Sequence, residues 1–278
     1  MDLRAFASPD QPVAAPELAP SVAAAYRRAL QALAQADMPF LVGGAFGLQH
    51  LTGFRRATKD LDLFVRQKDY GAVSAVLAEA GFDTDLTYPH WLGKAWRDDA
   101  RIDVIFNSGN GVAEVDDAWF EHAQAGEVLG VPVRLVPPEE SIWSKAFVME
   151  RERYDGADVI HLLRACAAEL DWTRLLARFG ANWRVLLAHL VLFGYAYPDE
   201  RAAVPLPLLD LLLHRLRDEA RTPPAQGHLC AGTLLSREQY LQAIEGEGYE
   251  DARATSASSM TAGDLAHWTA AIEGRSDG

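Results

Sequence analysis

The most constraining feature of this chain is an apolar strand pattern over residues 60–65, which read DLDLFV. Because a β-strand repeats every two residues, Asp60 and Asp62 point to one face, while the aliphatic residues between and after them point to the other, the natural core side. Two carboxylates so close together repel unless a positive charge lies between them. Mg²⁺ meets this need, because it takes oxygen ligands from carboxylates and from substrate phosphates. The pair therefore indicates metal-assisted chemistry on a nucleotide.

A third aspartate lies in a second apolar strand pattern, residues 101–106, which read RIDVIF. Asp103 points away from the apolar face of that strand. If the two strands are neighbours, Asp60, Asp62 and Asp103 converge on one site. Three convergent carboxylates can hold two Mg²⁺ ions, which clamp the attacking and leaving oxygens in nucleotidyl transfer. The alternative is that Asp103 is a polar residue at a strand edge; together with the pair, we favour the metal ligand.

A Gly-Gly turn, Gly43-Gly44, separates a short apolar strand at 40–42 from a helix expected over 45–51. A strand–glycine–helix junction lets a phosphate approach the backbone and meet the amide N–H groups of a helix N-terminus. The same dipeptide is also common in ordinary tight turns. Its value comes from its position one helix upstream of the aspartate pair.

Composition narrows the class of protein. The formal net charge of −13 argues against broad nucleic-acid binding, which relies on a basic surface. The two cysteines, Cys166 and Cys230, form no CxxC pattern, so neither a disulfide framework nor a thiolate zinc site is expected. The N-terminus lacks a secretory pattern, and the longest apolar run, 185–197, is too short to span a bilayer. We expect a cytoplasmic protein without a membrane partner.

The chain changes character at Pro137-Pro138. Residues 21–137 contain segments with the two-residue repeat of strands and segments with the repeat of about 3.6 residues of helices, which predicts an α+β core. Residues 138–222 show the helical repeat and predict a helical bundle region. Residues 1–20 predict a flexible N-terminal arm, and residues 223–278 a C-terminal extension that is partly disordered. In the core we expect helices over 21–36, 45–51 and 70–80 and strands over 40–42, 61–65, 91–96, 101–106 and 131–136. In the second half we expect helices over 139–152, 157–169, 172–179, 183–193 and 206–220.

The order of these motifs resembles the signature of the polymerase-β-like nucleotidyltransferases. That signature has Gly43-Gly44, then a helix, then Asp60 and Asp62 on one strand and Asp103 on a later strand. The resemblance covers roughly residues 38–170. It implies a nucleotidyltransferase-type mixed sheet with flanking helices, followed by a helical C-terminal part, which agrees with the α+β pattern above.

A fuller string over residues 43–63, with His50, Gly53, Arg56 and Thr58 in place, is similar to one bacterial branch of this superfamily. That branch contains the abortive-infection nucleotidyltransferase toxins and related minimal nucleotidyltransferases. The chain departs from the pattern at Ala45, where many members have serine. The missing hydroxyl removes one phosphate contact, so nucleotide binding must rest on backbone amides and other side chains.

The resemblance implies further nucleotide-binding residues. Arg56, Thr58 and Lys59 flank the aspartate pair, although they could equally stabilise the exposed end of the strand. Downstream, a helical Lys145 would lie at the triphosphate, and Asp158, which opens the next helix, would orient basic residues or line the site. The alternative for this region is a solvated helix face, because residues 150–153 alternate in charge.

The leading hypothesis is a Mg²⁺-dependent nucleotidyltransferase. It would move an NMP from an NTP such as ATP to an acceptor hydroxyl of a small molecule, a protein or an RNA, with release of pyrophosphate. The alternative is a catalytically idle nucleotidyltransferase fold that serves as a binding or regulatory subunit, for example with a partner protein in a toxin–antitoxin-type pair. Only Ala45 supports the alternative, and the three intact aspartates oppose it.

Overall fold

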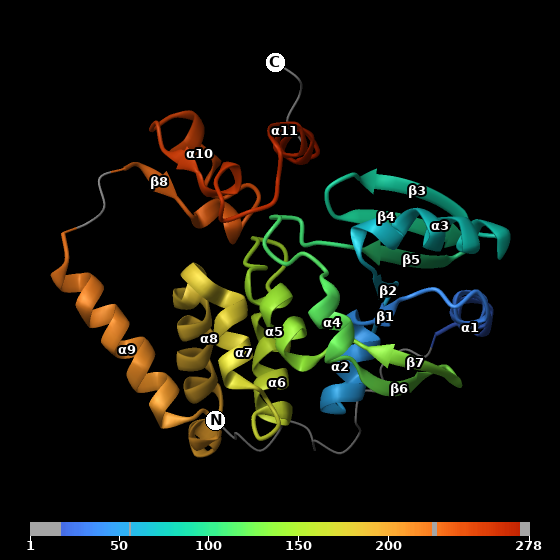
Figure 1. Ribbon diagram of the computed structural model, residues 1–278, viewed down its shortest axis with the longest axis horizontal. Helices are drawn as coiled ribbons and strands as arrows, with labels where there is room; N and C mark the ends of the chain where they lie inside the picture. The colour runs from blue at the N-terminus through green and yellow to red at the C-terminus, as the bar shows by residue number, and fades with distance from the viewer. Residues whose placement is uncertain (1–17, 56, 224–226, 273–278) are drawn as a thin grey trace, which may run out of the picture.

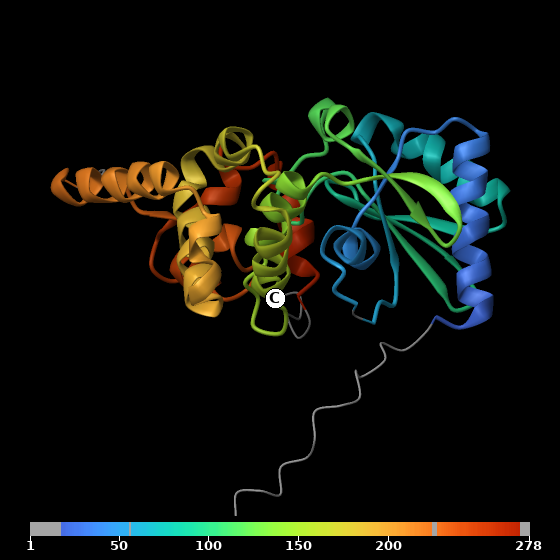
Figure 2. The same ribbon diagram turned by 90° about the horizontal axis from the view of Figure 1, so that it is seen from below.

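The computed structural model describes residues 18–55, 57–223 and 227–272 (Figure 1). A mixed sheet with its covering helices forms one side of the molecule, and a group of helices forms the other (Figures 1 and 2). The seven-stranded sheet has the order β3-β4-β5-β2-β1-β7-β6. Its strands are β1 (Leu41–Val42), β2 (Leu61–Phe64), β3 (Asp83–Tyr88), β4 (Leu92–Arg97), β5 (Ala100–Ile105), β6 (Gln124–Val128) and β7 (Val131–Leu135). The expected α+β class with a mixed sheet is confirmed.

Two of the strand pairs are parallel, β2 with β5 and β1 with β7, and the others are antiparallel. Helices α1 (Pro20–Gln35) and α3 (Tyr70–Glu79) cover one face of this sheet, with η2 (Gln67–Asp69) leading into α3. Leu61 and Leu63 of β2 are fully buried under them, together with Ile102 of β5. Because side chains alternate along a strand, this packing sends the aspartates of both strands to the opposite face. Apolar alternation thus decides where the polar face lies.

The opposite face of the sheet meets α2 (Gly44–Thr52), α4 (Asp117–Glu121) and the helical half of the chain. That half consists of α5 (Pro138–Ala146), α6 (Gly156–Cys166), α7 (Trp172–Phe179), η3 (Gly180–Asn182), α8 (Trp183–Ala196), η4 (Pro198–Ala203) and α9 (Leu206–Arg221). Its core joins these helices to Leu48 of α2 and Trp119 of α4. The expected helical part after Pro138 is confirmed.

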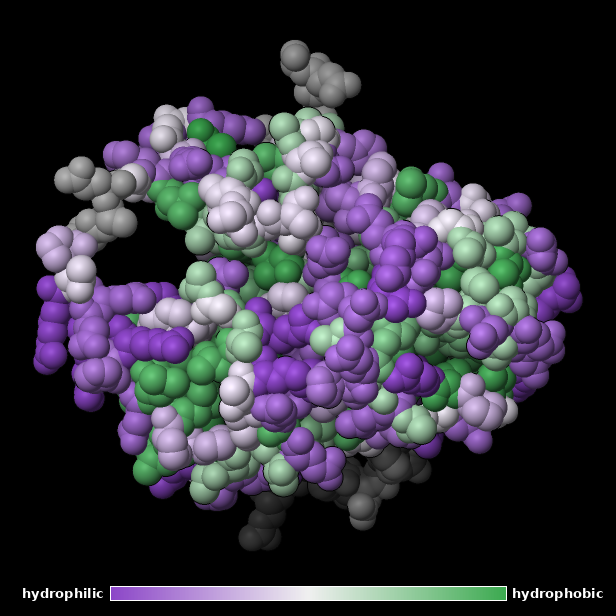
Figure 3. All heavy atoms as spheres, in the orientation of Figure 1, coloured by the Kyte–Doolittle hydropathy of each residue, from purple (hydrophilic) through white to green (hydrophobic). Residues whose placement is uncertain are grey.

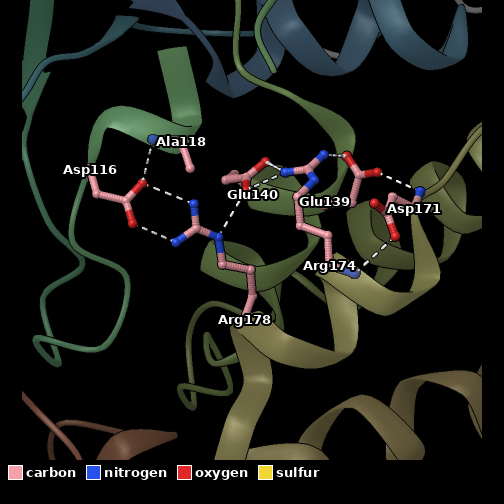
Figure 4. Close-up of polar contacts among 7 residues, drawn as sticks. All are labelled: Asp116, Ala118, Glu139, Glu140, Asp171, Arg174 and Arg178. Atoms are coloured by element: carbon pink, nitrogen blue, oxygen red, sulfur yellow. Dashed lines mark hydrogen bonds and ion pairs between the residues drawn. The ribbon is translucent and has the colours of Figure 1, made fainter. Parts of the chain in front are cut away.

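A buried ionic network fixes the start of α5 to α7 (Figure 4). Glu140 is fully buried and accepts hydrogen bonds from Arg174 at 2.5 Å and from Arg178 Nε at 2.9 Å. Arg174 also pairs with Glu139, whose carboxylate accepts from the backbone N–H of Asp171 at 2.7 Å. Buried charges are tolerated only when they are paired and hydrogen-bonded. These contacts therefore hold the first turn of α5 in one orientation.

The prediction of one helix over 139–152 is wrong in its second half, because α5 ends at Ala146. Residues 148–155 form a hairpin instead, with a bridge between Met149 and Tyr154. The backbone N–H of Met149 donates to the carbonyl of Leu235 at 3.0 Å. A contact from a segment more than 80 residues away thus overrides local helix propensity. The alternative of a solvated helix face at 150–153 is therefore wrong too, because these residues are not in a helix.

Strand β3 was not predicted, because the stretch DTDLTY contains a single aliphatic residue, Leu86. It pairs only with β4 and forms an edge of the sheet. Charged side chains are typical of edge strands, where they oppose pairing with another chain. Here the edge position explains the weak apolar signal.

One stretch, Trp172–Ala196, is long and apolar enough to cross a membrane by length and composition, with a mean hydropathy of 1.2 over its most apolar window. Its backbone is not one continuous α-helix, because α7 ends at Phe179 and Gly180 adopts φ +48° before α8 begins. Of that window, 39% is buried. Leu175, Leu186 and Phe193 belong to the core of the helical half. Core packing therefore accounts for much of the apolar character of this stretch.

The described residues of the C-terminal extension form β8 (Leu229–Cys230), η5 (Gly232–Leu234), α10 (Leu241–Glu245), β9 (Glu250–Asp251), η6 (Ala252–Ala254) and α11 (Ala262–Ala270). The flexible N-terminal arm falls almost wholly on residues outside the described ranges. Figure 3 shows polar side chains over most of the visible face, with apolar ones gathered over the α8–α9 side. Six large apolar residues of these two helices are exposed: Val191, Leu192, Tyr195, Leu206, Leu211 and Leu213.

Candidate active site

The structure brings Asp60, Asp62 and Asp103 together on the sheet face opposite α1 and α3. Strands β2 and β5 are parallel neighbours, and their register places Asp62 directly beside Asp103. One carboxylate oxygen from each of the three residues lies within 4.8 Å of the other two. All three side chains are half-buried. The sequence predicted this convergence on the condition that the two strands are neighbours, and their parallel pairing meets that condition.

Thr58 orients the first of these carboxylates. Its hydroxyl donates to Asp60 Oδ1 at 3.0 Å and lies 2.8 Å from the Asp60 carbonyl oxygen. Asp60 directly precedes the first residue of β2, and the register of β2 with β5 begins one residue later, at Leu61. Thr58 therefore contacts a proposed metal ligand. Its predicted contact with the nucleotide stays a prediction.

Burial, together with nearby like charges, raises the pKa of two of these carboxyl groups, Asp62 and Asp103. Burial, and after it the negative charges of Asp60 and Asp103, raise the pKa of Asp62 to about 7, against the opposing positive charges of Lys145 and Arg153. Burial also raises the pKa of Asp103, against the charge of Lys94. A divalent cation among these oxygens would relieve the repulsion. The donor set, three hard carboxylates, fits Mg²⁺.

The glycine turn lies directly against Asp62. The N–H of Gly43 donates to the carbonyl of Asp62 at 3.1 Å. Gly44 adopts φ +53°, and a Cβ at this position would lie 1.6 Å from Asp62 Oδ2. Only glycine combines this backbone conformation with such a close approach. The N-terminus of α2 is thereby held beside the carboxylate of Asp62.

Lys145 lies in the last turn of α5 and lines a small cavity with Gly43, Gly44 and Ser144. Its side chain is only 12% exposed, and its Nζ donates to Asp158 Oδ2 at 2.8 Å and to Asp155 Oδ2 at 3.3 Å. The structure thus places Lys145 and Asp158 together beside the glycine turn. Lys145 is a fixed positive charge, and its contact with a triphosphate stays a prediction.

Two basic residues near the carboxylates were not singled out from the sequence. Arg153, in the hairpin, donates to Asp155 at 3.0 and 3.1 Å, yet 66% of its side chain is exposed, and its charge acts on Asp60 and Asp62. Lys94 of β4 pairs in register with Asp103, and its Nζ lies 3.3 Å from Asp103 Oδ1. The only sequence signal for Lys94 was its place in an alternating strand. Arg153 was missed because the helix predicted over 139–152 concealed the hairpin in which this residue lies.

For two other predicted nucleotide-binding residues, Arg56 and Lys59, the structure describes no contact with the site residues. Arg56 lies outside the described residues. Lys59 is exposed, and its carbonyl oxygen accepts a hydrogen bond from the Tyr26 hydroxyl at 3.3 Å. Their roles in nucleotide binding stay predictions.

The raised pKa of Asp62 makes the stability of the metal-free protein depend on pH. Its pKa is 3.8 without the protein environment and about 7 in the fold, so protonation stabilises the native state. This contribution is complete below about pH 4 and is lost as the pH rises through about 7. In EDTA, we expect the melting temperature of the wild type to fall between pH 5 and pH 8 by several degrees more than that of Asp62→Asn.

Scanning calorimetry measures these melting temperatures. The same measurement with added Mg²⁺ is a second test. At pH 8, Mg²⁺ should raise the melting temperature of the wild type by mass action and leave that of Asp62→Asn nearly unchanged. Equal responses of the two proteins to pH and to Mg²⁺ would show that Asp62 is not a ligand.

Comparison with known proteins agrees with this geometry. A family model described as "Nucleotidyl transferase of unknown function (DUF2204)" matches residues 22–181, which include every residue of the site discussed above. A search of curated protein sequences gave no match.

Three solved structures with similar folds are remote in sequence. The antibiotic-resistance factor ANT(2'')-Ia is 19% identical, with a TM-score of 0.41 over 61% of this chain and 96% of that one. The lincomycin-bound lincosamide antibiotic adenylyltransferase LnuA is 13% identical, with a TM-score of 0.38 over 50% and 94%. An antigenic nucleotidyltransferase-like protein from Paracoccidioides brasiliensis is 16% identical, with a TM-score of 0.43 over 67% and 93%. At these scores the similarities decide nothing about the substrate.

Proposed function

Because the chain belongs to the DUF2204 family of nucleotidyl transferases, we propose that it transfers a nucleoside monophosphate from an NTP to an acceptor hydroxyl, using Mg²⁺ held by Asp60, Asp62 and Asp103. The observation that carries this proposal is the convergence of the three carboxylates within 4.8 Å of one another, with the glycine turn against them. A structural cluster of three aspartates would cost stability, because like charges repel. A catalytic metal site gives the cluster a purpose.

The chemistry assigns a role to each part of the site. The acceptor oxygen attacks the α-phosphorus, the bond to the bridging oxygen of the β-phosphate breaks, and pyrophosphate leaves. We assign to Asp103, whose pKa is raised by burial, the role of accepting the proton of the acceptor hydroxyl. Bound Mg²⁺ would neutralise phosphate charge and stabilise the transition state.

The remaining residues bind the NTP. The amides at the N-terminus of α2 meet phosphate oxygens, as is usual at a helix N-terminus. Arg153 is an exposed cation beside the carboxylates, and we assign it to the triphosphate, while Lys145 contributes a positive charge at the cavity that it lines with the glycine turn. Catalysis then comes mainly from positioning and charge neutralisation.

Label transfer tests the proposal and identifies the acceptor. The protein would be incubated with Mg²⁺ and each of the four NTPs labelled at the α-phosphate, together with either the small-molecule or the macromolecular fraction of a cell extract. We expect the wild type to transfer label from one NTP into one fraction, and Asp62→Asn to transfer none. If the wild type and Asp62→Asn behave alike with every NTP and both fractions, the enzyme proposal fails. The idle, regulatory fold would then take its place.

A further inference from the structure

The hairpin over residues 148–155 determines where Arg153 lies. The backbone N–H of Glu150 donates to the carbonyl of Arg153 at 2.8 Å, and the N–H of Asp155 donates to Val148 at 3.1 Å. Glu150 and Arg153 are therefore the two ends of a four-residue turn. Any displacement of Glu150 is passed directly to the backbone of Arg153.

Glu150 is held by residues far along the chain. Its Oε2 accepts a hydrogen bond from the hydroxyl of Ser236 at 2.6 Å, and its Oε1 accepts from the N–H of Arg237 at 2.8 Å. Ser236 is only 1% exposed. The residue before Glu150 is held as well, because the backbone N–H of Met149 donates to the carbonyl oxygen of Leu235. Charge-assisted hydrogen bonds of this kind are short and directional, so both oxygens of Glu150 are fixed.

Other residues of the C-terminal extension hold the loop that follows β5, the strand of Asp103. Asn110 Nδ2 donates to the carbonyl of Leu234 at 2.5 Å, and the hydroxyl of Ser258 donates to the carbonyl of Asn110 at 2.9 Å. Asn107 Nδ2 donates to Ser259 Oγ at 2.7 Å. One segment thus contacts the sheet side and the hairpin side of the site.

Helix α11 extends this contact to the β3–β4 hairpin. The ring of Trp268 lies 4.8 Å from that of Tyr88 and 5.5 Å from that of Trp91, and the guanidinium of Arg237 lies 4.6 Å from the Trp268 ring. Figure 1 shows this C-terminal part, orange to red, over both the helical half and the β3–β4 hairpin. Aromatic contacts of this geometry fix the helix on the end of the sheet.

We propose that residues 227–272 are a brace that joins the loop after β5, on the sheet side of the site, to the hairpin over residues 148–155. Glu150 is the positioning residue through which this brace holds Arg153 near the carboxylates. The brace lies outside residues 22–181, which the family model matches. The inference rests on the proposed function, in which Arg153 binds the triphosphate. The side-chain partners of Glu150 among the described residues are Ser236 and Arg237, so its role is to position Arg153.

A double-mutant cycle in the full chain tests the positioning role. The probe is a fluorescent N-methylanthraniloyl ATP with Mg²⁺, titrated into wild type, Glu150→Ala, Arg153→Ala and the double variant. We expect Glu150→Ala and Arg153→Ala each to weaken binding by about tenfold, the size of one lost charge-assisted contact. The double variant should bind as weakly as Arg153→Ala alone, because Glu150 has no effect once Arg153 is gone. If the double variant lost affinity by the product of the two single losses, the two residues would act independently, and the proposal would be overturned.

The matched control is Glu152→Ala, in the same hairpin and with the same change of charge. Glu152 is 78% exposed and pairs at 3.6 Å only with its exposed neighbour Arg151 among the described ion pairs. Exposed pairs contribute little, so probe binding should stay within about twofold of wild type. A loss equal to that of Glu150→Ala would mean that charge, and not the brace, matters.

Hydrogen exchange separates this inference from the proposed function. In the absence of nucleotide, Glu150→Ala and Ser236→Ala should speed amide exchange over residues 148–155, and Glu152→Ala should not. If the wild type binds no NTP, the proposed function fails, and exchange alone then decides whether the brace holds the hairpin. Unchanged exchange in Glu150→Ala would overturn the brace whatever the nucleotide result.

Discussion

Replacing Asp62 by asparagine is expected to lower kcat/KM for the NTP by about 10³-fold, because several kcal/mol of transition-state stabilisation depend on the metal ligands. The amide has nearly the shape of the carboxylate but no charge. It can therefore take the place of the carboxylate beside Gly44. It also relieves the repulsion from Asp60 and Asp103, so the variant should fold at least as well as the wild type. Steady-state release of pyrophosphate measures the loss.

The matched control for this variant is Asp85→Asn, on the same sheet. Asp85 is exposed on edge strand β3, and its register partner Lys94 separates it from Asp103. The substitution is chemically identical, and its effect on kcat/KM should be less than about twofold, since exposed charges contribute little at a distance. If both variants lose activity equally, general electrostatics and not metal ligation explains the result.

The largest effect on stability is expected from Glu140→Ala. The substitution leaves the guanidinium of Arg174 without its bidentate partner and removes one acceptor of Arg178 (Figure 4). Breaking a buried ion pair by removing one partner costs about 3–5 kcal/mol. For a chain of this size the melting temperature should fall by about 10 °C. Urea unfolding followed by circular dichroism measures the change in free energy.

An exposed ion pair elsewhere in the helical half provides the comparison. Glu200 pairs with Arg164 at 2.7 Å, and both side chains are about half exposed. Glu200→Ala should cost less than about 1 kcal/mol, because water screens this pair and competes for its hydrogen bonds. Equal losses in the two variants would contradict the importance of burial in the Glu140 network.

The sequence allowed the carboxylate site to be predicted because its geometry follows from local rules. Alternation in two strands fixed the face of Asp60, Asp62 and Asp103, and the strand–glycine–helix order fixed the place of the turn. What alternation left open was whether the two strands are neighbours. Their parallel pairing, with Asp62 beside Asp103, settles that point.

The parts of the site that were not predicted depend on contacts between distant segments. The hairpin that carries Arg153 exists because residues 235–237 capture Met149 and Glu150, and no local pattern at 148–155 indicates this. Similarly, Glu140 resembles an ordinary acidic residue in the first turn of a helix. Its complete burial follows from arginines of α7, more than 30 residues later.

The most direct test of the proposed metal site is to locate the ion. Crystals grown with Mn²⁺ and a non-hydrolysable NTP would be measured at a wavelength where manganese scatters anomalously. The proposed function requires anomalous density among the carboxylates of Asp60, Asp62 and Asp103, with the triphosphate beside the Gly43-Gly44 turn, and no such density in crystals of Asp62→Asn. Manganese bound elsewhere, or a nucleotide bound away from these three residues, would contradict it.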